Sequence, residues 1–258
     1  MYLLHTQRWS LLALTFGAAL LSYSAFAEQQ ANEPPVVWGL GVGVLVAEQP
    51  YTNMSNKTLV FPNFLYISEH IRLVGDGLDL KLASQDQWTF ALRVRYSLLD
   101  GYKSGDAPIL SGMNDRSAGG WVGGAVTLKT DFAKISLEAL GDVSGKSNGR
   151  QAALNFVRDF RSGSFILTPH AAIRYADKKY VNYYFGVTRS EATSYRSAYE
   201  GASTVNFHIG LRTKYMVDRK QTIFLDAGAT ALGKGITDSP LVDKKIIPLV
   251  AVGYLYSF

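Results

Sequence analysis

Apolar and polar residues alternate along most of the chain with a period of two. In residues 88–98 every even position is apolar or aromatic, whereas the odd positions are polar or small and include two arginines. The same alternation recurs over 38–47, 135–142, 165–175 and 205–215. A period of two indicates β-strands with one apolar and one polar face, and runs of about ten residues have the length of tilted transmembrane strands.

This alternation predicts ten strands, joined in turn by short and long connections. The predicted strands cover 36–47, 60–83, 88–99, 119–130, 133–143, 150–160, 163–175, 203–215, 220–231 and 246–258. Outer-membrane barrels have short periplasmic turns, long external loops and an even number of strands. We therefore predict an all-β fold, a transmembrane antiparallel up-and-down β-barrel.

One predicted strand, 60–83, is too long to be regular. Its alternation changes phase across Gly75-Asp76-Gly77. A glycine bulge would explain the change within a single strand. A hairpin would instead add a strand, which a further strand around 180–187 would have to match. The alternative prediction is therefore a barrel of twelve strands.

The C-terminal strand carries the most specific pattern. Counting back by twos from the last residue gives only aromatic and apolar side chains, namely Phe258, Tyr256, Tyr254, Val252 and Val250. A terminal phenylalanine at the end of such a run resembles the signal that the barrel assembly machinery of the outer membrane recognises. This machinery and outer-membrane lipid are the partners that the pattern predicts.

The N-terminus has the pattern of a secretory signal peptide. His5 and Arg8 precede an apolar stretch over 11–21, and Ala25-Phe26-Ala27 forms a small-x-small cleavage site. The apolar stretch is shorter than the roughly 20 residues of a membrane-spanning helix. We expect cleavage after Ala27, a short periplasmic lead over 28–35, and an outer-membrane barrel over 36–258.

Composition narrows the function classes. Among the 258 residues only 18% are charged, and the absence of cysteine excludes a disulfide framework and any thiolate chemistry. A mean hydropathy of +0.02 is too low for a bundle of membrane helices but fits strands with two unlike faces. The net charge of +5 is spread along the chain, so we expect no nucleic-acid partner.

The inward positions of the predicted strands hold nearly balanced charges. The basic residues are Lys81, Arg93, Arg95, Arg174, Arg212 and Lys214, and the acidic residues are Asp79, Glu138, Asp142, Asp159 and Asp226. Because unpaired buried charge is costly, we expect these groups to pair and to fill a narrow barrel. A thin, weakly anion-selective pore is the alternative.

The longest predicted external loop, 176–202, is rich in tyrosine. Its tyrosines are Tyr180, Tyr183, Tyr184, Tyr195 and Tyr199. Such amphipathic rings suit contacts with a partner molecule or packing over the barrel mouth, and we favour the packing.

Catalysis is not predicted. A barrel hydrolase needs a serine within reach of a histidine, and residues two apart share a face of a strand, but no serine follows His70, His170 or His208 at that spacing. His170 and His208 should face inward on neighbouring strands, where we favour structural hydrogen bonding over a pH-sensitive pair. No metal-binding or phosphate-binding motif appears, so no cofactor or metal is expected.

Several short motifs resemble the MltA-interacting protein family, MipA/OmpV, of Gram-negative outer membranes. These are Trp38-Gly-Leu-Gly-Val-Gly, Leu110-Ser-Gly-Met113, Tyr180-Val-Asn-Tyr-Tyr-Phe-Gly-Val187 with Glu191-Ala192, Ser239-Pro240-Leu241 and Gly253-Tyr-Leu-Tyr-Ser-Phe258. The resemblance implies a non-enzymatic scaffold that joins a lytic transglycosylase to a bifunctional murein synthase. We expect the barrel to be a monomer. A small channel or a surface adhesion protein is the alternative function.

Overall fold

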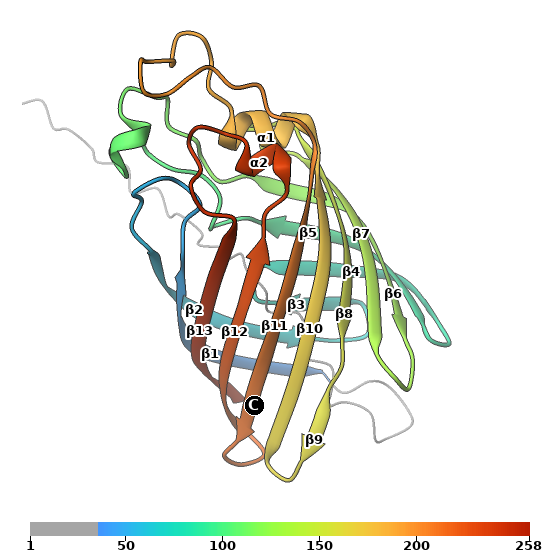
Figure 1. Cartoon of the computed structure of the whole chain (residues 1–258). Coiled ribbons are helices and arrows are strands. Elements are labelled where there is room, and N and C mark those ends of the chain that lie inside the picture. The colour runs from blue at the N-terminus through green and yellow to red at the C-terminus, as the bar shows by residue number, and fades with distance from the viewer. Residues whose placement is uncertain (1–35) are drawn as a thin grey trace, which may run out of the picture.

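The computed structural model describes residues 36–258, and its strands close into one antiparallel barrel (Figure 1). Closure occurs at β1 (Val37–Ala47), which pairs with β2 (Lys57–Ile67) on one side and with β13 (Ile246–Ser257) on the other. The remaining strands are β3 (Ile71–Val74), β4 (Gly77–Gln85), β5 (Trp88–Tyr96), β6 (Gly120–Lys129), β7 (Lys134–Asp142), β8 (Arg150–Val157), β9 (Phe160–Ser162), β10 (Phe165–Ala176), β11 (Thr204–Met216) and β12 (Gln221–Ala231). The predicted signal peptide and the lead over 28–35 lie outside the described residues.

The thirteen strands form a barrel of twelve. Strands β8 and β9 both pair with β10 and are two parts of one strand, interrupted at residues 158–159. The predicted all-β antiparallel barrel is confirmed. The prediction of ten strands is wrong, and the alternative number, twelve, is correct.

The error in the strand number arises between residues 57 and 85. This segment contains β2, β3 and β4, separated by a turn over 68–70 and a second turn at Gly75-Asp76. Gly75 has a φ of +61°, the left-handed conformation that glycine adopts without strain. The change of phase across Gly75-Asp76-Gly77 is therefore due to a turn and not to a glycine bulge, and the register irregularity of this segment lies further on, between Lys81 and Ala83 of β4. Residues 180–187 do not form the expected matching strand, because residues 180–185 belong to the helix α1 (Lys178–Phe185).

The outer face of the barrel is apolar and its inner face is filled by large side chains. Along β1 the outward residues, such as Val42 at 52% exposure, alternate with inward glycines. A Cβ on Gly43 would lie 2.4 Å from the ring of Phe61, so this glycine makes room for an aromatic ring in the lumen. Within residues 36–258, no helix is long and apolar enough to cross a membrane.

Loops at one end of the barrel fold into a roof, which we define as residues 48–56, 97–119, 177–203 and 232–245 (Figure 1). It contains α1, α2 (Lys234–Thr237) and a 3-10 helix, Pro108–Leu110. A continuous buried cluster joins the four segments and comprises Tyr51, Tyr102, Ala107, Leu110, Met113, Ala176, Val181, Tyr184, Phe185, Val187, Ile236 and Leu241. The roof therefore has a hydrophobic core of its own above the lumen.

The last residue should contribute to barrel closure. The ring of Phe258 stacks on Trp38 of β1 at 3.9 Å between centroids, and its amide donates to the Trp38 carbonyl at 3.0 Å. We expect Phe258→Ala to lower the fraction of folded barrel in the outer membrane several-fold, because it removes the contact that aligns β13 with β1. Heat-modifiable migration on SDS gels measures this fraction. Phe132→Ala, an exposed phenylalanine in the β6–β7 turn, is the control, and equal losses in both variants would contradict the expectation.

Candidate functional site: the roofed lumen

One ionic cluster occupies the inner wall formed by β3, β4, β5 and β7. Arg93 forms two hydrogen bonds to Asp79, at 2.7 and 2.8 Å, and a third to Glu138. Arg95 donates to the other oxygen of Glu138 at 2.8 Å, and Arg72 lies 3.6 Å from Asp79. Arg93 thus links β4 to β7, two strands that are not neighbours in the sheet.

A second ionic cluster lies on β10, β11 and β12. Arg212 donates to Asp226 through Nε at 2.7 Å, and His170 Nε2 lies 3.2 Å from the other carboxylate oxygen. The rings of His170 and His208 stack at 5.3 Å, and His208 Nδ1 is 3.0 Å from the Thr230 hydroxyl. A catalytic triad needs one histidine that contacts both the nucleophile and the acid. Here the Asp226 carboxylate contacts His170 and the Thr230 hydroxyl contacts His208, so these residues do not form such a triad.

Side chains fill the lumen at the level of the two clusters. Glu138 is 2% exposed, and Arg212 and Asp226 are each 1% exposed. Trp121 on β6, Phe224 on β12 and Leu255 on β13 are buried to the same degree. Charged groups lining a water-filled pore would remain accessible to solvent, so this level of the lumen is packed.

The remaining predicted lumen charges lie outside the two clusters. Lys81 donates to the Ser68 carbonyl at the β2–β3 turn, at 2.8 Å. Asp142 accepts from Ser144 and Ser147 and organises the β7–β8 loop, so it does not join the lumen network. The other three are Asp159, which accepts from Thr168, Lys214, which is buried, and Arg174, which lines a cavity.

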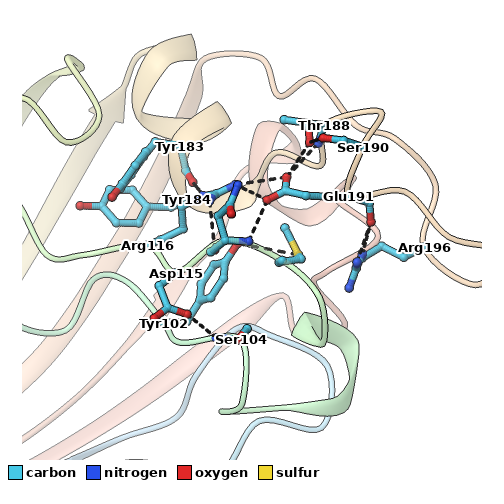
Figure 2. Close-up of polar contacts among 12 residues, drawn as sticks. Tyr102, Ser104, Asp115, Arg116, Tyr183, Tyr184, Thr188, Ser190, Glu191 and Arg196 are labelled. Carbon is cyan, nitrogen blue, oxygen red and sulfur yellow. Dashed lines mark hydrogen bonds and ion pairs between the residues drawn. The ribbon is translucent and has the colours of Figure 1, made fainter.

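The roof is held together by a buried ion pair (Figure 2). Arg116 contacts Glu191 at 2.9 Å and donates to the Tyr183 carbonyl at 2.7 Å. Glu191 also accepts from the amides of Asn114 and Thr188, at 3.0 and 3.1 Å. Burial alone would raise the pKa of Glu191, but these two amides, the Thr188 hydroxyl and Arg116 hold it below its usual value. Glu191 is therefore a carboxylate at neutral pH and joins loop 97–119 to loop 177–203.

Arg196 forms a second link in the roof. It is 1% exposed and donates to the carbonyls of Ile109, Ser111 and Glu191. Sequence reasoning missed both Arg116 and Arg196, because neither lies in a periodic segment. The motifs Leu110-Ser-Gly-Met113 and Glu191-Ala192 were signals for this region, and Arg196 binds carbonyls in both of them.

All five predicted loop tyrosines lie in the roof, and four of them pack or form hydrogen bonds within it. Tyr184 is 1% exposed, and its hydroxyl donates to the Ser117 carbonyl. Tyr183 accepts from the Ser117 amide, and Tyr199 donates to the Gly235 carbonyl. Tyr180 lies 4.8 Å from the Tyr184 ring, whereas Tyr195 is 63% exposed.

A cavity of about 290 Å³ separates the roof from the ionic clusters. Its upper wall is mainly apolar and includes Tyr51, Tyr180, Tyr184, Phe185 and Leu249. Its lower wall is polar and includes Arg95, Glu138, Gln151, Arg174 and His208. Residues 36–258 contain no group of three or more acidic, histidine or cysteine side chains that could hold a metal ion. This amphipathic cavity is the candidate binding site.

A closed barrel with an apolar outer face, a packed charged interior and a roof of loops defines an outer-membrane β-barrel protein. The chain belongs to the family of MltA-interacting protein MipA, whose sequence profile matches residues 40–258. The resemblance found in the sequence motifs is thereby confirmed, and so is the outer-membrane location.

Curated relatives carry outer-membrane names. MltA-interacting protein of Escherichia coli K12 is 25% identical over 224 residues, which cover 86% of this chain and 90% of that protein. Outer membrane protein OmpV of Vibrio cholerae is 29% identical over 157 residues, and Omp26La of Vibrio anguillarum is 28% identical over the same length. The match to these two Vibrio proteins spans 61% of their length.

Solved structures show similar barrels at low identity. An outer-membrane channel from Pseudomonas putida F1 has a TM-score of 0.43 at 12% identity, covering 90% of this chain and all of that chain. The NanC porin has a TM-score of 0.40 at 8% identity, covering 86% of this chain and 99% of that chain.

Removal of Arg93 should destabilise the barrel. Arg93→Met would leave Asp79 and Glu138 buried with fewer partners, and breaking a buried pair in this way costs about 3 kcal/mol or more. We expect a lower urea midpoint for unfolding in detergent micelles, followed by circular dichroism. Arg219→Met, at an exposed turn, should leave the midpoint unchanged; an equal shift in both variants would contradict a specific role for Arg93.

The roof should loosen in acid. Since the pKa of Glu191 is depressed, its contribution to roof stability is present at neutral pH and lost as the pH falls below the ordinary glutamate value of about 4.3. A spin label on Tyr195→Cys, specific because the chain has no cysteine, should become mobile in that range. In Glu191→Gln the label should already be mobile at pH 7. A label that is equally immobile in both proteins at pH 7 would refute this role of Glu191.

Proposed function

We propose that this protein is a non-enzymatic scaffold of the outer membrane that binds a lytic transglycosylase and a bifunctional murein synthase. The observation that carries the proposal is the similarity to a protein named MltA-interacting protein, which extends over 86% of the chain. The packed lower lumen supports a scaffold over a channel, since Glu138 and Asp226 fill it with side chains and not with water.

A scaffold for murein enzymes needs a contact surface on the periplasmic side, where the short turns lie. One candidate surface combines two aromatic rings with an arginine, the residue types that dominate binding at protein interfaces. Arg158 lies 4.0 Å from the Phe132 ring and 4.7 Å from the Phe160 ring, and both rings are about half exposed or more. We name Phe132, Arg158 and Phe160 the turn patch.

Affinity capture tests the scaffold and the turn patch together. The purified full-length barrel in nanodiscs should retain a lytic transglycosylase and a murein synthase from solubilised envelopes, identified by mass spectrometry. The double variant Phe132→Ala/Arg158→Ala should retain about tenfold less, as expected when a central aromatic and arginine contact is lost. Tyr195→Ala, an exposed aromatic change on the roof, is the matched control.

The outcomes separate the two parts of the proposal. If the unaltered barrel retains neither enzyme, the scaffold function is refuted. If the barrel retains them but the turn-patch variant does so equally well, the function stands and the contact surface lies elsewhere.

A further inference from the structure

The barrel wall has a notch beside β2. Strand β3 ends at Val74, which pairs with Leu65, so residues 57–64 of β2 extend beyond it. Among residues 36–258 no strand pairs with this part of β2 on the β3 side, although β1 pairs with all of it on the other. The turn at Gly75-Asp76 forms the lower border of the notch. We call the unpaired edge over 57–64 the open edge.

Pro62 lies in the middle of the open edge. The Ser68 amide donates to the Ile71 carbonyl, so the backbone N–H of Ser68 points toward β3. Along a strand the backbone N–H and C=O groups of successive residues point to opposite sides, so those of the even-numbered residues of β2 point toward β3 as well. Thr58, Val60 and Phe64 therefore present their amides to the notch, whereas Pro62 has none to present. A proline at this place disfavours pairing with an added strand, which keeps the notch from being closed by another sheet edge.

A short segment after β5 covers the notch from inside. Lys57 donates to the Leu98 carbonyl across the upper part of the notch, at 2.7 Å. Leu99 packs on the inner face of β1 and β2, with the cluster that includes Leu45 and Phe61. The Lys57–Leu98 hydrogen bond is partly buried.

The notch leads to the cavity beneath the roof. Val74, Asp76 and Gly77 line the cavity from below, and Ser97 and Leu99 line it from the covering segment. Among the outward side chains of the open edge Thr58 is polar, whereas Val60, Pro62 and Phe64 are apolar, with Val60 68% exposed, so the notch faces lipid over 60–64. The roof lies over the external end of the same cavity, with Tyr51, Tyr180 and Tyr184 in its lining.

The polar wall of the cavity has hydrogen-bond donors in excess. Nε of Arg95 and Nε2 of Gln151 are buried without a hydrogen-bond partner among the described residues, as are Nε and Nη2 of Arg72. Arg174 lines the cavity and has no carboxylate within ion-pair distance in residues 36–258. Buried donors without partners are costly, so the cavity favours a group rich in acceptor oxygens.

The acidic groups of the cavity do not cancel this preference. Asp79 and Glu138 are paired with arginines, and burial raises the pKa of Asp100. Asp76 faces the cavity from the β3–β4 turn, on the side of the notch. Arg95 lies on β5 beside this turn, where Gly77 pairs with it, and it reaches Gln151 at 3.3 Å. A negative head group would contact Arg95, Gln151 and Arg174, with its tail against Tyr180, Phe185 and Leu249.

We propose that the cavity binds one single-chain amphiphile with an oxyanion head group, and that this ligand enters from the outer leaflet through the notch. The Lys57–Leu98 hydrogen bond holds the covering segment shut between binding events. The inference is independent of the scaffold function, because it concerns the lumen and the lipid-facing wall and not the periplasmic turns.

Binding can be measured with cis-parinaric acid in nanodiscs of phosphatidylcholine. Trp121 lies in the lumen, 5.8 Å from the Tyr180 ring, and would transfer energy to a bound probe. Trp38→Phe and Trp88→Phe remove the other two tryptophans of the described barrel, which face lipid. We expect a saturable signal that dodecanoate and dodecyl phosphate displace and dodecanol does not. An unsaturable signal, or equal displacement by dodecanol, would overturn the proposal, and displacement by one of the two anions alone would identify the head group.

Arg174→Gln tests the head-group contact. We expect the affinity for the probe to fall at least about tenfold, whereas Arg219→Gln at an exposed turn should bind as the parent does. Heat-modifiable migration identifies a folded Arg174 variant. If that variant does not fold, Gln151→Leu, which keeps the size and removes the donor, replaces it. Unchanged affinity in the folded variant would refute the assignment of the head group.

The rate of exchange tests the path of entry. Lys57→Met removes the bond to Leu98 and should speed release of the probe several-fold, measured by stopped-flow displacement with dodecanoate. Glu191→Gln loosens the roof and should leave the rate unchanged. The opposite result, faster release from the Glu191 variant alone, would show entry through the roof and overturn the lateral path.

Discussion

The constraint on which this structure depends is that every backbone donor and acceptor within lipid needs a partner. Closure of the sheet meets it, with β1 paired on both sides along its length. A closed antiparallel barrel whose chain ends lie on one side needs an even number of strands. The two turns between residues 57 and 85 preserve this parity, because they divide one long segment into three strands. The roof, which lies beyond the lipid, is free of the constraint and is built from loops and short helices.

Closure creates an interior that must be filled. Aromatic rings such as Phe61 fill it where an inward glycine on the facing strand leaves room. Elsewhere charged side chains do so, and the burial of Arg93, Glu138, Arg212 and Asp226 is tolerable because these four are paired. Arg93 shows how pairing also connects the wall, since it binds one carboxylate on a neighbouring strand and another two strands away. The interior is therefore closely packed around Arg212 and Asp226 and holds a cavity beneath the roof, where loops and not strands determine the spacing.

The sequence predicted the strands after residue 88 because each separates lipid from interior over about ten residues, which makes the alternation visible. The prediction of strands failed between 57 and 85 because β3 has only four residues. Four residues are too few to show an alternation of their own, so β3 could not be distinguished from an irregularity in one long strand. The same alternation predicted that Arg93, Arg95 and Glu138 point into the barrel. It could not predict which of them pair, because the register between two strands is not determined by the sequence of either strand alone. Arg116 and Arg196 could not be predicted because they bind loop carbonyls, whose positions arise from the packed roof.

The open edge of β2 is the place where the pairing rule is least well met. Unpaired backbone groups in hydrocarbon cost several kcal/mol each, so the edge is tolerable only if polar atoms reach it. Two features of the chain reduce the cost: Pro62 removes one donor, and Lys57 brings the segment that follows β5 across the gap. A polar cavity directly behind the notch offers a further source of partners, from water or from the head group of an amphiphile. The short β3 and the donor-rich cavity thus belong to one arrangement, because a full-length β3–β4 hairpin would separate the cavity from the membrane.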